Sequence, residues 1–310
     1  MIQEKNNYHI PVLLKECIKA LNIRSDCIYC DATLGGGGHS QAILEENHSV
    51  KLYSFDQDPD AIAETSFLKE KFGDRIKIIH DNFVNLRTRL ALERVKKIDG
   101  IIFDLGISSH QIDEKERGFS YMKDGRLDMR MNQTSKITAE NIVNEYSQTD
   151  LIRIFKEYGE ERESFAIAQS ICNFRKNEKI TSTVQLADII DKATRSQKKI
   201  KARSRIFQAI RIEINQELKN LKSALKDSVN LLNPGGRIVV LTYNSLEDRI
   251  TKQYFNYETK DCICPSLFPR CNCNKIKRLE IHKSIIPSEV DLLNVRARSA
   301  RLRYATRVTG

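Results

Sequence analysis

The run of glycines at residues 35–38 is the part of this 310-residue chain whose composition most clearly predicts chemistry. The apolar stretch 27–30 and the segment 31–34 precede these glycines, and His39 comes directly after them. Glycines between a strand and a helix let the backbone approach a ligand without Cβ clashes, and the helix N-terminus then presents free N–H groups. Asp56 closes a second apolar segment about twenty residues later, where a carboxylate suits a ribose diol. These residues predict a nucleotide site at the first strand–helix turn.

The spacing of the glycines indicates which class of nucleotide the site binds. A Gly-x-Gly-x-x-Gly fingerprint would need a glycine where this chain has Ser40, and the sequence contains no Gly-Lys-Ser/Thr of a phosphate loop. A cofactor with an adenosine but no pyrophosphate fits better, and S-adenosylmethionine is the common one. The alternative is a tight turn that binds no ligand.

The elements that must position these residues alternate between strands and helices. Strand-like segments are 28–33, 52–56, 76–80 and 98–105, and helix-like segments are 39–46, 59–72 and 83–96. This alternation predicts βαβ units and a parallel sheet, hence an α/β fold. A ligand then lies beyond the carboxyl ends of the strands, where Gly35 to His39, Asp56, Asp81 to Phe83 and Asp104 converge.

The alternation stops after Gly106 and resumes at the turn 233–236, which leads into a strand at 237–243. Apolar residues from Ile206 to Leu232 recur at spacings of three and four, which predicts one long helix before that turn. We therefore expect a core domain of residues 1–112 and 216–310, interrupted by a helical insertion of residues 113–215. Within the insertion, the glycine-punctuated segments 117–121 and 125–131 are either loops that frame a substrate or ordinary surface excursions.

Several strings in this order resemble the RsmH (MraW) family, the S-adenosylmethionine-dependent cytosine-N4 methyltransferases of small-subunit ribosomal RNA. The resemblance runs from about His9 to Arg307 and rests on segments 9–14, 31–40, 56–59, 104–111, 117–121, 126–131, 245–249 and 296–300. It implies a class I (Rossmann-like) methyltransferase fold with an inserted helical domain that handles the RNA. The implied reaction transfers a methyl group to the N4 amine of a cytidine in the decoding region of 16S rRNA.

The same resemblance implies roles for individual residues in cofactor binding. Gly37, Gly38 and His39 would line the methionine end of S-adenosylmethionine, and Asp56 would hold the ribose hydroxyls. Phe83 would lie against the adenine, and Asp104 and Gln111 would complete the site.

The implied reaction needs a hydrogen acceptor, because the lone pair of the exocyclic amine of cytosine is delocalised into the ring. Asp104 is the first candidate, followed by Ser108 and Ser109, although Asp104 could instead contact only the cofactor. The target base must leave its stack, and Phe119 or Tyr121 either stacks on it or fills the core. Family members often have His where this chain has Asn244, so we assign no essential base there.

The net charge of +10 favours polyanionic partners. Basic residues gather at 195–205 and at 296–307, which favours RNA contact, although such runs are usually solvated faces. We expect small-subunit rRNA, or the assembled small ribosomal subunit, as the partner. We also expect a cytoplasmic protein with no membrane span, because the sequence has no long apolar run and no apolar signal core. The oligomeric state is left open, with a dimer as one option.

Four of the eight cysteines form two Cys-x-Cys pairs, Cys262 with Cys264 and Cys271 with Cys273. Thiolates at this spacing could hold zinc, but the strongest zinc pattern uses Cys-x₂-Cys pairs. We therefore expect reduced thiols in a loop and assign no metal, with structural zinc as the alternative.

Two other functions compete with a cytosine-N4 methyltransferase. One is a noncatalytic ribosome-assembly factor that keeps the fold and binds RNA, which only Asn244 favours. The other is an enzyme of the same fold that acts on DNA or on a small molecule.

Overall fold

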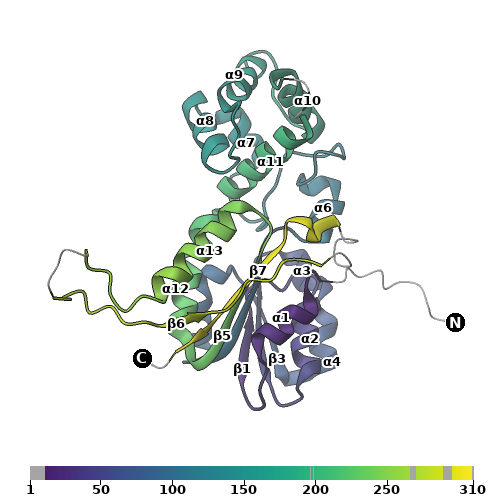
Figure 1. Ribbon diagram of the computed structural model, residues 1–310. Helices are drawn as coiled ribbons and strands as arrows, with labels where there is room; N and C mark the ends of the chain where they lie inside the picture. Colours follow the sequence, from purple (N-terminus) through teal and green to yellow (C-terminus); the bar gives the residue numbers. More distant parts are fainter. Residues whose placement is uncertain (1–10, 196, 198, 266–269, 289–294, 309–310) are drawn as a thin grey trace. The chain divides into compact units, whose positions relative to one another are not determined.

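The computed structural model describes residues 11–195, 197, 199–265, 270–288 and 295–308 (Figure 1). The chain forms two compact units. The first contains the residues up to Gly106 and from Leu218 onward, and the second is Ile107–Glu217. The structural boundaries thus lie at 106/107 and 217/218, a few residues from the expected 112/113 and 215/216.

The strands of the first unit form one mixed sheet within the described residues. They are β1 (Ile28–Asp31), β2 (Lys51–Asp56), β3 (Ile76–His80), β4 (Ile98–Asp104), β5 (Leu232–Thr242), β6 (Leu279–Ile281) and β7 (Arg301–Arg307). Their order is β3-β2-β1-β4-β5-β7-β6, with β1 to β5 parallel and β7 antiparallel to both of its neighbours. This arrangement confirms the expected α/β fold of the class I, Rossmann-like methyltransferase type.

Helices cover both faces of this sheet. They are α1 (Leu14–Leu21), α2 (Gly38–Glu46), α3 (Pro59–Glu64), α4 (Ser66–Phe72), α5 (Leu86–Leu92), α12 (Glu217–Leu231) and α13 (Ser245–Glu258), with short 3₁₀ helices η1 (Gly73–Arg75), η2 (Phe83–Asn85) and η6 (Val295–Ser299). Successive residues of a strand point to opposite faces. Ile101 and Phe103 of β4 therefore join one apolar cluster with α5, α12 and α13, while Ile102 joins another with α1, α2 and α4.

Three expected helices differ from the structure. The segment 59–72 divides at Thr65, whose hydroxyl donates to the Ala61 carbonyl at 2.7 Å. The segment 83–96 is the 3₁₀ helix η2 followed by α5, which ends at Leu92. The single long helix expected from Ile206 to Leu232 is wrong: Gln216 has a φ of +50°, which breaks it into α11 and α12 at the boundary between the units.

The strands β6 and β7 were not expected from the sequence, in which the segment 296–307 stands out for its charge. Arg301 and Arg303 alternate there with Leu302 and Tyr304. Alternation of this kind is typical of a half-buried strand and could have predicted β7.

The second unit is helical and has its own apolar core. Its elements are α6 (Ser109–Asp113), η3 (Lys115–Arg117), α7 (Ala139–Glu145), α8 (Gln148–Glu157), α9 (Ser164–Phe174), α10 (Thr183–Ala193) and α11 (Lys199–Asn215). The core includes Ile142, Phe155, Ile171, Ile190 and Ile206, all fully buried. Among the helices described in either unit, none combines the length and the apolar character that a membrane span requires.

Candidate functional site

The candidate residues of the first unit lie at the carboxyl ends of neighbouring strands. Asp31 ends β1 and pairs in register with Ser54 of β2 and Ile102 of β4. Asp56 ends β2 and Asp104 ends β4, so both flank the turn that leaves β1. This edge is where parallel α/β sheets bind ligands.

The glycine turn is shaped by the protein's own packing. Gly37, the N-cap of α2, has a φ of +81°, and a Cβ there would lie 2.8 Å from Cδ1 of Leu68. A Cβ on Gly38 would lie 2.3 Å from Cγ of Pro11. Glycine at both positions therefore lets α2 begin in close contact with its neighbours. Within the turn, the Gly37 amide donates to the Leu34 carbonyl at 2.7 Å.

Asp56 ties the glycine turn to β2. Its Oδ2 accepts from the Gly35 amide at 2.8 Å and its Oδ1 accepts from the Asp58 amide at 2.9 Å. Burial raises its pKa to about 6, against the lowering effect of these two amides. Each carboxylate oxygen has more than one acceptor direction, so both can still accept from a ligand diol.

A buried polar group beneath the turn was not predicted as part of the site. Asp31 accepts from the Ser40 hydroxyl at 2.7 Å and from the Thr33 amide at 3.1 Å, and Ser40 in turn lies 2.8 Å from the Ser54 hydroxyl. These bonds join β1, β2 and the first turn of α2. Asp31 and Ser40 are within the glycine-containing string, but nothing in the string distinguishes a supporting carboxylate from a ligand-binding one.

Asp104 is held at the end of β4 by hydrogen bonds of its side chain and of its backbone. Its Oδ1 accepts from the Tyr243 hydroxyl at 2.7 Å, and its backbone amide donates to Thr33 Oγ1 at 2.6 Å. Burial raises the pKa of Asp104 to about 7, although the Tyr243 hydrogen bond acts in the opposite direction. Tyr243 was missed in the sequence; its place directly after β5, the strand adjacent to β4, was the available indication.

His39 lies on the other oxygen of Asp104, with Nδ1 3.4 Å from Oδ2. Its side chain is 5% exposed, and burial lowers its pKa against the opposing effect of Asp31. The Nε2 atom is buried and has no hydrogen-bond partner among the described residues. A buried polar atom without a partner is costly, so a ligand group that pairs with it would be stabilised.

Phe83 lies beyond the end of β3 in the short helix η2. Asn82 caps this helix, because its side-chain oxygen accepts from the Val84 amide at 2.9 Å. The side-chain nitrogen of Asn82 donates to Gln57 Oε1 at 2.7 Å. The Phe83 ring makes an edge contact with Phe103, with centroids 5.6 Å apart and planes at 86°. The half-buried ring is thus held at the same edge as Asp56.

The other three candidates belong to the second unit. Ser108 is the N-cap of α6, and its hydroxyl accepts from the Gln111 amide at 3.2 Å. The Gln111 side chain accepts from the Ser108 amide at 3.1 Å, which completes a capping box. Ser109 is the first residue of α6. Local helix capping therefore already explains part of the sequence around Gln111.

Comparison with known proteins adds to this geometry. The family model described as the MraW methylase family matches residues 6–308. The chain belongs to the MraW methylase family. It is a methyltransferase that uses S-adenosylmethionine, as the family and the fold require.

Two relatives illustrate the likeness. The Ribosomal RNA small subunit methyltransferase H of Finegoldia magna is 47% identical over 307 residues, which cover 97% of this chain and 98% of that protein. The protein of the same name from Clostridioides difficile is 43% identical over 308 residues, with 97% and 99% covered. A solved structure of an rRNA methylase from Streptococcus thermophilus is more distant: it is 12% identical, covers 100% of this chain and 99% of its own, and has a TM-score of 0.43.

Asn244 of this methylase has a structural role. It is the N-cap of α13, and its Oδ1 accepts from the amides of Leu246 and Glu247, each at 3.0 Å. The Glu247 carboxylate accepts from the Tyr243 amide at 3.0 Å, so the same capping box holds the residue that donates to Asp104. Asn is among the favoured N-cap residues, which accounts for its presence.

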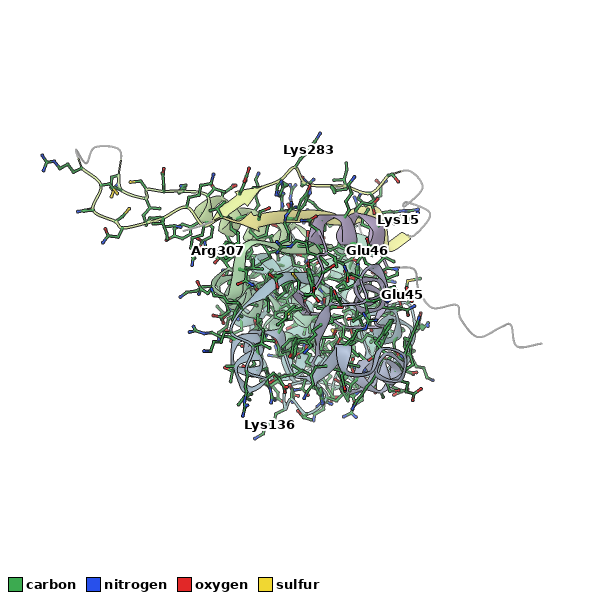
Figure 2. All side chains as sticks on the ribbon, turned by 90° about the horizontal axis from the view of Figure 1, so that it is seen from below. Lys15, Glu45, Glu46, Lys136, Lys283 and Arg307 are labelled. Carbon is green, nitrogen blue, oxygen red and sulfur yellow. The ribbon has the colours of Figure 1, made fainter. Side chains whose placement is uncertain are left out.

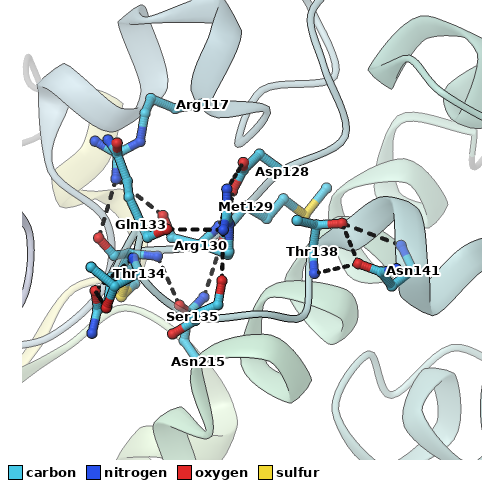
Figure 3. Close-up of polar contacts among 12 residues, drawn as sticks. Arg117, Asp128, Met129, Arg130, Gln133, Thr134, Ser135, Thr138, Asn141 and Asn215 are labelled. Carbon is cyan, nitrogen blue, oxygen red and sulfur yellow. Dashed lines mark hydrogen bonds and ion pairs between the residues drawn. The ribbon is translucent and has the colours of Figure 1, made fainter.

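The segments 117–121 and 125–131 are organised by their own contacts (Figure 3). Asp128 and Arg130 form a two-pronged ion pair at 2.8 and 2.6 Å, and Arg130 also donates to the Ser135 carbonyl at 2.6 Å. Arg117 donates to the Arg130 carbonyl at 3.0 Å, and Asn215 donates to the Met129 carbonyl at 2.9 Å. These bonds explain Arg117, Asp128 and Arg130 without a substrate.

The two aromatic candidates for base stacking also have partners within the second unit. Phe119 is buried in the apolar core. Tyr121 is half-buried and makes an edge contact with Phe207 at 5.4 Å. Core packing therefore accounts for Phe119, and it accounts for one side of Tyr121.

The basic runs divide into paired and exposed residues. In the first run, Arg203 forms a two-pronged ion pair with Asp191, and Arg205 lies 3.4 Å from Glu161. In the second, Arg303 binds Asp248 at 2.6 and 3.0 Å. The exposed cations are Arg195, Lys199, Lys201 and Arg298. His9, Lys198 and the side chain of Arg296 lie outside the described residues.

Proposed function

We propose that this methylase transfers the methyl group of S-adenosylmethionine to the N4 amine of a cytidine in the decoding region of small-subunit 16S rRNA. The observation that carries the proposal is Asp104, a carboxylate beside the glycine turn whose pKa lies near 7. The names of the relatives support small-subunit rRNA as the substrate.

The residues at the sheet edge fit S-adenosylmethionine. Gly37 and Gly38 would line its methionine end. The Gly38 amide and the unpaired Nε2 of His39 would bind it, since the Gly37 amide already donates to the Leu34 carbonyl at 2.7 Å. Asp56 would accept from the ribose hydroxyls. Phe83 would contact the adenine, and Asp104 and Gln111 would complete the site.

The bound cofactor supplies a methyl group on a sulfonium, which needs no further activation by the protein. The task of the protein is to make the amine nucleophilic. In our proposal Asp104 accepts a hydrogen bond from the N4 amine, which draws that nitrogen toward sp³ geometry, and then accepts the proton that the nitrogen loses. A carboxyl with a pKa near 7 suits proton transfer at neutral pH.

Other residues take part beside Asp104. Tyr243 orients the carboxylate through Oδ1, so Oδ2 remains for the amine and for His39. Ser108 and Ser109 are proposed as further acceptors for the second hydrogen of the amine.

The RNA would contact the helical second unit through the exposed Arg195, Lys199 and Lys201. Basic side chains bind phosphates with little sequence information, so the choice of nucleotide would come from the shape of a folded ribosomal site. We propose the assembled small subunit in the cytoplasm as the natural substrate.

A methyl-transfer assay tests the proposal. Purified protein is incubated with methyl-labelled S-adenosylmethionine and with small subunits, free 16S rRNA or DNA, and the products are digested to nucleosides. We expect label in N4-methylcytidine from the small subunits, and little from DNA. Label in another nucleoside, or no transfer to any ribosomal substrate, would contradict the proposal.

A further inference from the structure

Four cysteine thiols converge in the segment between α13 and β6. The Sγ atoms of Cys262, Cys264, Cys271 and Cys273 all lie within 4.8 Å of one another. The Sγ–Sγ distances are 3.9 Å for Cys264 with Cys271, 3.5 Å for Cys271 with Cys273, and 3.9 Å for Cys273 with Cys262. Two Cys-x-Cys pairs from opposite sides of a loop thus point their sulfurs at one point.

These separations match a tetrahedral metal site. A Zn–S distance of about 2.3 Å places the corners of a regular tetrahedron about 3.8 Å apart. A disulfide would require about 2 Å between two of the sulfurs. The three Sγ–Sγ distances of 3.5, 3.9 and 3.9 Å lie close to the tetrahedral value, so they fit four thiolates around one ion better than two covalent bridges.

Apolar packing does not account for the convergence of the four sulfurs. None of the described residues from 260 to 277 is buried, and Ile263 and Ile276 are 44% and 53% exposed. Figures 1 and 2 show the segment running away from the sheet. Burial of apolar side chains therefore does not offset the conformational entropy lost on ordering this loop, whereas a metal would.

The base of the loop is anchored, and the sulfurs receive backbone amides. Glu258 at the end of α13 pairs with Lys275 at 3.0 Å and with Arg278 through Nε at 2.6 Å. The Ile263 amide donates to Cys273 Sγ, and the Cys264 amide donates to Cys262 Sγ, each at 3.4 Å. Hydrogen bonds of this kind orient metal ligands and stabilise thiolate charge.

We propose that Cys262, Cys264, Cys271 and Cys273 bind one Zn²⁺ in a structural site. Four thiolates close the tetrahedron, so the ion has no open position for catalysis and acts to hold the loop in one conformation. The proposal replaces the expectation of unliganded thiols, which rested on the absence of Cys-x₂-Cys pairs in the sequence. It is independent of the methyl-transfer proposal, because no site residue of that proposal lies in the segment.

The metal content of the untagged full-length protein tests this proposal. The protein is purified from zinc-supplemented cells under reducing conditions, passed through gel filtration and analysed by elemental mass spectrometry. We expect close to one zinc per chain. The Cys262→Ser/Cys271→Ser variant should retain only background zinc, while Cys172→Ser, a half-buried cysteine of α9, should keep the full amount.

Cobalt substitution keeps the test decisive if the double variant does not fold. The wild-type protein loaded with Co²⁺ should show a thiolate-to-cobalt charge-transfer band and the intense visible bands of tetrahedral coordination, both abolished by Zn²⁺. Wild-type protein with no bound metal, stoichiometric iron in place of zinc, or an octahedral cobalt spectrum would overturn the assignment.

Discussion

At the scale of single residues, Asp104 illustrates how one carboxylate acquires its properties from its neighbours. Tyr243 donates to one carboxylate oxygen of Asp104, and His39 Nδ1 lies 3.4 Å from the other. Burial raises the pKa of Asp104 to about 7. An ordinary surface aspartate would be ionised far below neutral pH and would be a weak base. The surroundings therefore make Asp104 suited to accept the amine proton.

The Asp104→Asn variant separates catalysis from cofactor binding. Asn keeps an acceptor for Tyr243 but cannot take up a proton near neutral pH. We expect kcat for methyl transfer to fall by about 10²–10⁴-fold, with little change in the Kd of S-adenosylmethionine in equilibrium dialysis. An equal loss of both would assign Asp104 to cofactor binding alone.

The pH dependence provides the control for this variant. Asp104 acts when deprotonated and its pKa is raised to about 7, so the wild-type kcat should rise as the pH increases through 7 and then level off. The residual activity of Asp104→Asn should lack this rise. A rise that persists in the variant would show that another group titrates.

Asn244 gives a prediction about stability. Removing the cap in Asn244→Ala should cost about 1 kcal/mol, within a range of about 0.5–2 kcal/mol, because two amides of α13 lose their acceptor. Asn244→Ser should keep the cap and the methyl-transfer rate. Thermal unfolding and rate measurements on both variants check this, and a large rate loss in Asn244→Ser would instead indicate a chemical role for the amide.

At the scale of elements, the strand ends were the most predictable part. Apolar runs bounded by Asp56 and Asp104 located β2 and β4, and the order of the alternation predicted the parallel sheet. Gln216 could not be recognised as a helix break, because its positive φ has no local signature in a non-glycine residue. The contacts of Asp31 and Tyr243 depend on long-range pairing, so local patterns do not reveal them.

The glycine turn gives a test at this scale. Gly37→Ala places a methyl group 2.8 Å from Leu68 at a φ of +81°. Gly235→Ala is a matched control, since it has a φ of +79° and the nearest atom to the added methyl group is the end of the Arg24 side chain at 3.8 Å. The control should lose about 1–2 kcal/mol from backbone strain, and Gly37→Ala should lose more and should also weaken S-adenosylmethionine binding. Thermal unfolding and dialysis check this, and equal effects of the two changes would contradict it.

At the scale of the whole molecule, the chain divides into two compact units, each with its own apolar core. The first unit carries the sheet and most of the candidate cofactor residues. The second carries the exposed Arg195, Lys199 and Lys201. The sequence indicated this division through the loss of strand patterning after Gly106, but its basic runs overstated the surface charge, because Arg203, Arg205 and Arg303 are paired with carboxylates.

Charge reversal at Lys199 and Lys201 tests the proposed RNA surface. We expect Lys199→Glu/Lys201→Glu to raise the KM for small subunits and to lower the salt dependence of RNA binding, by about 0.7 in the log–log slope for each phosphate of single-stranded RNA that is no longer neutralised. The Kd of S-adenosylmethionine should not change. Lys176→Glu/Lys179→Glu, exposed residues after α9, make the same charge change elsewhere in the unit. Equal effects of the two double variants would mean that only total charge matters.

Equilibrium dialysis with labelled S-adenosylmethionine tests most directly whether the edge of β1, β2 and β4 is the cofactor site. We predict one bound S-adenosylmethionine per chain. Asp56→Ala should weaken binding about tenfold to a hundredfold, because a hydrogen bond to a charged group is worth about 1.5–3 kcal/mol. The exposed Asp74→Ala should bind like the wild type. Absence of binding by the wild-type chain, or full affinity in Asp56→Ala, would contradict the account.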